Sequence, residues 1–175
     1  MPRLTEEQVD AIRSAPGVSS VSLESPFPAY LVAADGTVIG NANTRSWGHP
    51  WSTAIADGDL LLAGDEPVTA HDVVVDESVS TAAGVGVGEV VRVQLATGVE
   101  EFTVSGIVRR PGEQFEHALF FTGQAATGFG GAPVMALVST SGATALQSAV
   151  PSLEVITGTA RAGSLQLDLR QAELA

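Results

Sequence analysis

The sequence contains no cysteine and no lysine, and these two absences exclude whole classes of chemistry. Without cysteine, the chain can form no disulfide, hold no metal through thiolates and carry no thiol nucleophile. Without lysine, it cannot form a Schiff base through a side-chain amine. The eight cationic residues are all arginine, against 20 acidic residues, and the formal net charge is -12 at pH 7. No basic stripe is available to neutralise phosphates, so nucleic-acid binding is not an expected function.

Long apolar runs are also missing. Stretches such as Leu60–Ala63 and Val73–Val75 are far shorter than the roughly 20 residues that a helix needs to span a bilayer. Glu6, Glu7 and Asp10 occupy positions where a signal peptide would be apolar. The chain is nevertheless 45% hydrophobic over 175 residues, which suits one domain with a buried core. We therefore expect a soluble globular domain with a solvated acidic surface.

The two ends of the chain share a pattern of helix, proline and strand. Near the start, Thr5 and Gln8 have the spacing of a capping box, Pro16 follows the predicted helix, and residues 18–21 are extended. This pattern predicts a short helix that leads directly into a strand.

Near the other end, residues 142–150 are predicted to form a helix that Pro151 stops, and residues 153–156 are predicted to form a strand. The tail over residues 160–175 fits either a helix or a strand, and its length favours a helix. The repeated order suggests that both ends of the chain build one small α/β layer.

The middle of the chain carries the clearest β signal. In residues 91–95 and 102–104, apolar and polar side chains alternate on either side of a turn at residues 96–98. Alternation of this kind predicts an antiparallel hairpin with one buried face and one polar face.

Other middle segments are expected to be short or irregular. Asp76 is placed to cap a helix over residues 78–83, which Gly84 ends. Residues 41–59 are expected to be a loop, and the small residues over 124–132 are expected to be a flexible loop.

These elements predict an α+β fold with two lobes. We expect a small α/β lobe from approximately residues 1–40 and 133–175, with a β-rich lobe of approximately residues 41–132 inserted between them. All of residues 1–175 then form a single domain.

Candidate sites are few. Trp47 and Trp51 flank a proline-containing segment and could form a partner contact, since tryptophan is enriched at interface hot spots, or could cover one edge of the core. Glu113, Glu116 and His117 could hold a metal, although such polar loops usually face solvent. We therefore expect no catalytic, metal-binding or cofactor-binding residues, and we expect no cofactor.

Three stretches carry a resemblance to a known family. Residues 72–79 read DVVVDESV, residues 82–93 read AAGVGVGEVVRV, and residues 102–108 read FTVSGIV. Together they resemble the extracytoplasmic domain of FtsX-like, MacB-type permeases of ABC transporters. The opening helix followed by Ala15–Val18 looks like the start of that domain, and residues 153–158 look like its end.

The resemblance implies a bacterial, non-enzymatic domain on the extracytoplasmic face of the cell membrane, in a membrane protein whose transmembrane helices are absent from this chain. It also implies that a cytoplasmic ATPase subunit acts through the full-length permease, which pairs with a second permease copy. The domain would relay ATPase-driven movement to an external lipoprotein, peptide, antibiotic or cell-wall hydrolase. The alternative is a free-standing secreted binding module that uses the loop containing Trp47 and Trp51.

Overall fold

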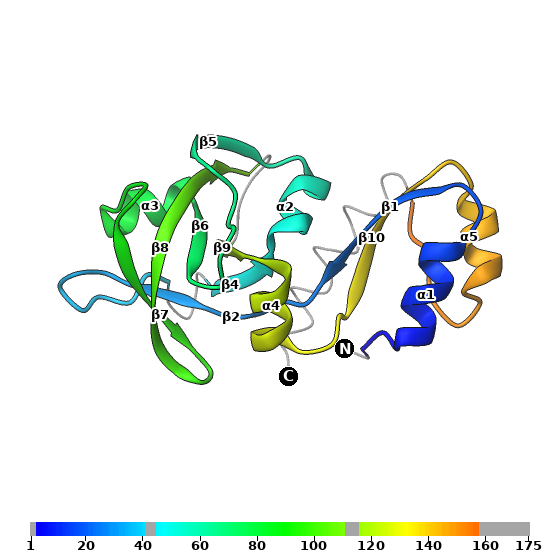
Figure 1. The fold of residues 1–175 in the computed structure, drawn as a ribbon, viewed down its shortest axis with the longest axis horizontal. Helices are drawn as coiled ribbons and strands as arrows, with labels where there is room; N and C mark the ends of the chain where they lie inside the picture. The colour runs from blue at the N-terminus through cyan, green and yellow to red at the C-terminus, as the bar shows by residue number, and fades with distance from the viewer. Residues whose placement is uncertain (1–2, 41–44, 111–115, 158–175) are drawn as a thin grey trace. The chain divides into compact units, whose positions relative to one another are not determined.

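The computed structural model describes residues 3–40, 45–110 and 116–157 (Figure 1). Its helices are α1 (Glu6–Ser14), α2 (Trp51–Asp57), α3 (Glu77–Ala83), α4 (Gly123–Gly130) and α5 (Ala143–Ala149). Its strands are β1 (Val18–Glu24), β2 (Phe27–Pro28), β3 (Tyr30–Val32), β4 (Arg45–Pro50), β5 (Leu60–Gly64), β6 (Asp72–Asp76), β7 (Val90–Leu95), β8 (Gly98–Arg109), β9 (Glu116–Phe121) and β10 (Met135–Thr140). This mixture of helices and strands confirms the predicted α+β class.

The described residues divide into two compact units. The smaller unit comprises residues 5–21 and 138–157, and the larger comprises residues 3–4 and 22–137. The smaller unit contains fewer residues than the lobe expected from the sequence. One reason is that β3 pairs with β7 and therefore belongs to the large sheet.

The smaller unit is built from α1, α5 and parts of β1 and β10. The predicted capping box is present, because Thr5 Oγ1 accepts from the Gln8 backbone N–H at 3.2 Å and Gln8 Oε1 accepts from the Thr5 N–H at 2.9 Å. Val9 and Ile12 are buried on the inner side of α1. The predicted strand over residues 153–156 is wrong, since that segment follows α5 as irregular chain.

The larger unit is organised around one mixed sheet. Its strands lie in the order β2-β4-β9-β6-β8-β7-β3, and β5 pairs with β8 outside this path. β4 is parallel to β9 and β6 is parallel to β8, whereas the other pairs are antiparallel. The hairpin of β7 and β8 confirms the prediction made from alternating side chains.

Helices cover both faces of this sheet. Successive side chains of a strand point to opposite faces, so β6 sends Val73 and Val75 one way and Val74 the other. Val73 and Val75 belong to the main core cluster with Val79 of α3 and Ala126 of α4. Val74 belongs to a smaller cluster, which contains residues of α2. All three valines of β6 are fully buried, as a strand covered on both faces requires.

Two segments expected to be loops are regular structure. Residues 41–59 include β4 and α2, and residues 124–132 include most of α4. The flexible-loop prediction fails because Thr122 caps α4 through the Ala125 N–H and because Ala125 and Ala126 are buried. Tertiary packing thus outweighs the weak helix propensity of its glycines.

The short helix α3 matches its prediction closely. Asp76 is the N-cap residue and its Oδ1 accepts from the Val79 N–H at 2.8 Å. Gly84 ends the helix with φ 67°, a left-handed conformation that glycine adopts without the steric cost of a Cβ.

Candidate interaction site

Both tryptophans lie on the side of the sheet that α2 covers. Trp47 and His49 are two residues apart on β4, so they share a face, and they stand opposite Ala118 and Phe120 in the parallel register with β9. Trp51 is the first residue of α2. The structure therefore brings the two indoles to the same face, on a strand and a helix where the sequence suggested one loop.

Trp51 covers part of the smaller core cluster. Its ring meets Phe120 edge-on, with ring centroids 6.1 Å apart and an interplanar angle of 83°. Its indole N–H donates to Glu66 Oε2 at 2.9 Å. The side chain is half-buried, so one part packs on the core and another part faces outward.

Trp47 differs from Trp51 in the hydrogen bonding of its indole nitrogen. Its Nε1 is buried and makes no hydrogen bond within the described residues. An unsatisfied buried donor costs roughly 1–3 kcal/mol of stability. Such a group in a native domain calls for an explanation, because most buried polar atoms have partners.

Buried polar groups gather on this face beside the tryptophans. His49 Nδ1 lies 3.2 Å from Glu24 Oε1, and only 13% and 9% of the two side chains are exposed. The His49 ring also packs against Phe120, with centroids 5.6 Å apart. Polar groups with so little access to water lose their hydration on burial, which the contact between them offsets.

Asp59 is a further buried acidic group in this region. Its side chain is 2% exposed, and Arg110 Nε lies 3.9 Å from its carboxylate. Burial raises the pKa of Asp59 to about 6, although the positive charge of Arg110 opposes this shift. The sequence offered no signal for this pair, because Asp59 precedes β5 and Arg110 follows β8, and only the pairing of those strands brings them together.

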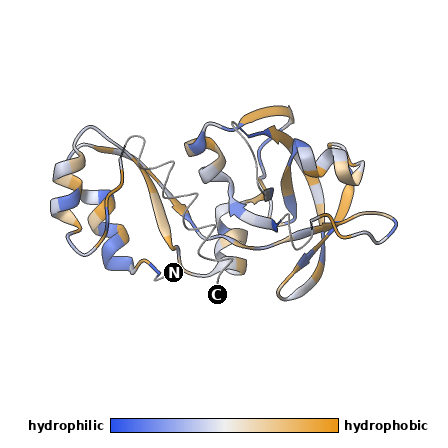
Figure 2. Cartoon of the chain, turned by 180° about the vertical axis from the view of Figure 1, so that it is seen from behind, coloured by the Kyte–Doolittle hydropathy of each residue, from blue (hydrophilic) through white to orange (hydrophobic). Residues whose placement is uncertain are grey.

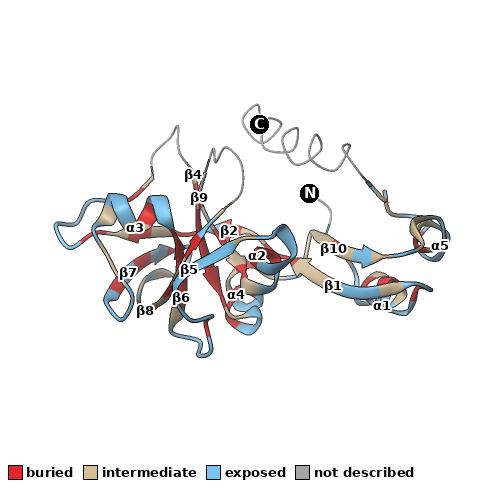
Figure 3. Ribbon diagram, turned by 90° about the horizontal axis from the view of Figure 1, so that it is seen from above, coloured by how far each residue is buried: buried red, intermediate tan, exposed pale blue. Residues whose placement is uncertain are grey.

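Apolar side chains are exposed on α2 and on the neighbouring strand β5. Ile55 of α2 is 63% exposed, and Leu60, Leu61 and Leu62 of β5 are 60%, 38% and 37% exposed. Figure 2 shows β5 as a hydrophobic strand, and Figure 3 shows it as exposed. β5 pairs only with β8 among the described strands, so its other edge carries no described partner. An exposed apolar edge strand of this kind favours pairing with another chain.

The metal hypothesis receives no support from the described part of the chain. Glu113 lies outside the described residues, and no group of three potential metal ligands occurs within them. His117 Nδ1 instead lies 2.8 Å from the Ser78 hydroxyl, which donates to Asp76 Oδ1 at 2.6 Å. This chain of polar groups joins the start of α3 to β9 and was not foreseen from the sequence.

The fold is that of an α+β domain with two compact units. None of the described helices is long and apolar enough to cross a membrane. The chain belongs to the family of MacB-like periplasmic core domains, whose sequence model matches residues 1–165. It is therefore an extracytoplasmic domain of an ABC transporter permease, and the resemblance drawn from its three sequence stretches is confirmed.

Solved structures show the same fold. The periplasmic region of MacB from Actinobacillus actinomycetemcomitans is 16% identical with a TM-score of 0.56, and the match covers 98% of this chain and 75% of that one. A domain of a putative permease protein from Porphyromonas gingivalis is 17% identical with a TM-score of 0.57, covering 82% and 72%. The extracellular domain of the noncanonic ABC-type transporter YknZ from Gram-positive bacteria is 14% identical with a TM-score of 0.57, covering 84% and 78%. No curated protein sequence matches the chain.

Proposed function

We propose that this domain relays movement of the permease membrane helices, driven by a cytoplasmic ATPase, to a substrate or partner outside the membrane. The observation that carries this proposal is the family match, which spans almost the whole chain. In this proposal the domain catalyses no reaction. The permease acts together with a second copy of itself. The smaller and larger units are the two lobes, and the relay is a change in the position of one lobe relative to the other.

The proposed contact surface is the α2 face with its two tryptophans. Trp51 is half-buried, and Ile55 lies one helical turn further along α2 on the same side. Trp47 lies on the same face of the sheet, on β4. Tryptophan and exposed aliphatic side chains supply large contact areas with modest loss of side-chain freedom, which suits a binding surface.

Distance measurements between spin labels in the full-length permease, assembled with its ATPase in lipid nanodiscs, test the relay. One label pair joins the lobes, at Thr81→Cys on α3 and Ser148→Cys on α5, both exposed positions. A control pair lies within the larger lobe, at Thr81→Cys and Ala96→Cys. This chain supplies no cysteine of its own to compete for the label.

We expect the distance distribution of the first pair to differ between the nucleotide-free and the ATP-trapped permease, and that of the control pair to stay the same. A first pair that is unchanged by nucleotide would refute a relay through the two lobes. A control pair that shifts equally would show deformation of the larger lobe instead.

A further inference from the structure

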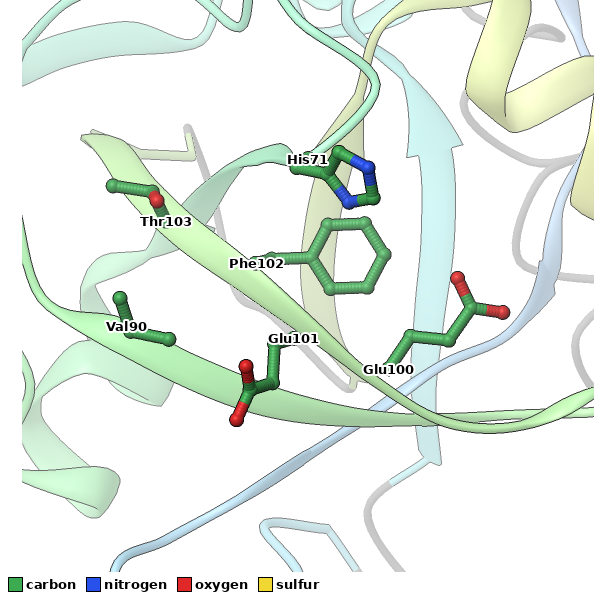
Figure 4. Close-up of a pocket in the computed structure, with 6 residues that line it drawn as sticks. All are labelled: His71, Val90, Glu100, Glu101, Phe102 and Thr103. Atoms are coloured by element: carbon green, nitrogen blue, oxygen red, sulfur yellow. The ribbon is translucent and has the colours of Figure 1, made fainter.

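A shallow groove on the larger unit lies along an open edge of β8. Its lining residues come from the turn before β6 and from the hairpin: His71, Val90, Glu100, Glu101, Phe102 and Thr103 (Figure 4). The groove does not include Trp47 or Trp51, so it is separate from the contact surface on the α2 face.

The edge is open because β8 is longer than the strand beside it. β6 begins at Asp72, which stands opposite Thr103, and the Thr103 N–H donates to the His71 carbonyl at 2.7 Å. Before Thr103, β8 pairs with β7 on its other edge, and no described strand pairs with it on this one. Because backbone groups alternate in direction along a strand, the N–H and C=O groups of Val99 and Glu101 point to the open edge as those of Thr103 do.

Each face of this edge presents a carboxylate. Glu100 shares one face with Phe102, whose ring lies 6.3 Å from the His71 ring between centroids. Glu101 shares the other face with Thr103 and stands opposite Arg92 of β7, on the side of β8 away from the open edge, and Val90 stands opposite Thr103. An added extended strand alternates its side chains between the same two faces, so two consecutive residues of that strand would meet the two glutamates.

The negative charge of the groove favours a cationic peptide over a second copy of this chain. The chain carries a net charge of -12, so a second copy would bring like charge to these two glutamates. The complementary occupant is an extended peptide segment with two consecutive cationic residues. Such a segment would gain backbone hydrogen bonds from Val99 and Glu101 and charge pairing from the two carboxylates.

We infer that the open edge of β8 binds an extended, dibasic segment of an external partner protein by strand addition. This inference names a class of partner for the domain and so rests on the proposed function. Binding is measured on this chain alone, whereas the relay is measured on the assembled permease, so failure of one is distinguishable from failure of the other.

The probe is a fluorescein-labelled peptide of valine and threonine with a central pair of arginines, and binding is followed by fluorescence anisotropy at low salt. We expect E100Q/E101Q to weaken binding by about fivefold to tenfold, since exposed charge pairs each contribute modestly. The matched control E6Q/E7Q removes the same charge from α1 and is expected to leave the affinity unchanged. Equal weakening in both variants would refute the groove and indicate general attraction to an acidic chain.

Strand addition is tested through the backbone. Val99→Pro removes an N–H from the open edge while leaving the bonds to β7, and proline is tolerated at such edge positions. We expect weaker peptide binding with unchanged circular dichroism, and we expect no binding of the same peptide when its central backbone nitrogens are methylated. Unchanged binding of either V99P or the methylated peptide would overturn the inference.

Discussion

The two faces of the large sheet are built on different principles. The face beneath α3 and α4 is apolar and centred on a group of packed aromatic rings: Phe27, Phe102, Phe121 and Phe129. The face beneath α2 has a smaller apolar cluster beside buried polar groups, among them the His49–Glu24 and Asp59–Arg110 pairs. Burying apolar area stabilises a fold, whereas burying charge costs free energy unless it is well compensated.

This difference indicates that the two faces of the sheet have different roles. The aromatic face supplies the stability that holds the strands in register. The α2 face retains buried polar groups that a purely apolar core would exclude. Local departures from optimal packing are typical of surfaces kept for function.

The largest expected effect comes from the aromatic face. Phe121 is fully buried, with its ring centroid 5.2 Å from that of Phe102 and 5.4 Å from that of Phe27. Phe121→Ala should lower the free energy of unfolding by about 3–5 kcal/mol, measured by urea denaturation, because it leaves a large cavity. Phe129→Ala is the control and should cost less, since Phe129 is only partly buried. Equal losses of unfolding free energy in the two variants would show that the aromatic face is not tightly packed around Phe121.

A smaller, pH-dependent effect is expected on the α2 face. The pKa of Asp59 is raised by burial from 3.8 to about 6, so the folded state binds its proton more tightly than the unfolded state does. Its contribution is fully present below about pH 4 and is lost as pH rises through about 6. Asp59→Asn, which stays neutral, should therefore be more stable than the wild type above pH 7 by about 2 kcal/mol.

The measurement is the difference in free energy of unfolding between the wild type and D59N across pH 4 to 8. This difference should grow from about pH 4 to about pH 6 and stay level above that, whereas the difference between the wild type and F121A should stay nearly constant. A flat D59N difference would mean that Arg110 compensates the buried carboxylate fully.

The smallest effects distinguish the two tryptophans. Trp47→Phe removes a buried N–H that has no hydrogen-bond partner within the described residues, so stability should stay the same or rise by up to about 1 kcal/mol. Trp51→Phe removes a donor to Glu66 and should cost about 0.5–1 kcal/mol. Thermal unfolding of the two variants side by side measures the contrast. A greater loss of stability for W47F than for W51F would contradict this prediction.

The sequence predicted those elements whose signals are local. The capping box of Thr5 and Gln8, the Asp76 cap and the β7–β8 hairpin each depend on residues close together in the chain, and all are present. The family could also be recognised from the sequence, because the stretch from β6 to β8 contains distinctive spacings of valine and glycine.

The sequence did not predict β4, because its stability comes from distant partners. β4 reads RSWGHP, without the β-branched residues typical of strands, and it is held by parallel pairing with β9. Gly48 is required there because a Cβ at this position would collide with the Phe27 ring. The Asp59–Arg110 pair was hidden for the same reason, since its members meet only after β5 and β8 have paired.

The carboxylate of Asp76 has a consequence for how the larger unit folds. One oxygen accepts from the Val79 N–H within the same helix, and the other accepts from the Ala118 N–H on β9, 42 residues further along the chain. The first bond can form in an isolated segment, but the second needs β9 to be docked against β6. A single buried carboxyl group thus couples a local event to a long-range one, and a partly folded chain with α3 formed but β9 undocked lacks the second hydrogen bond. Asp76 therefore makes the folding of this region more cooperative.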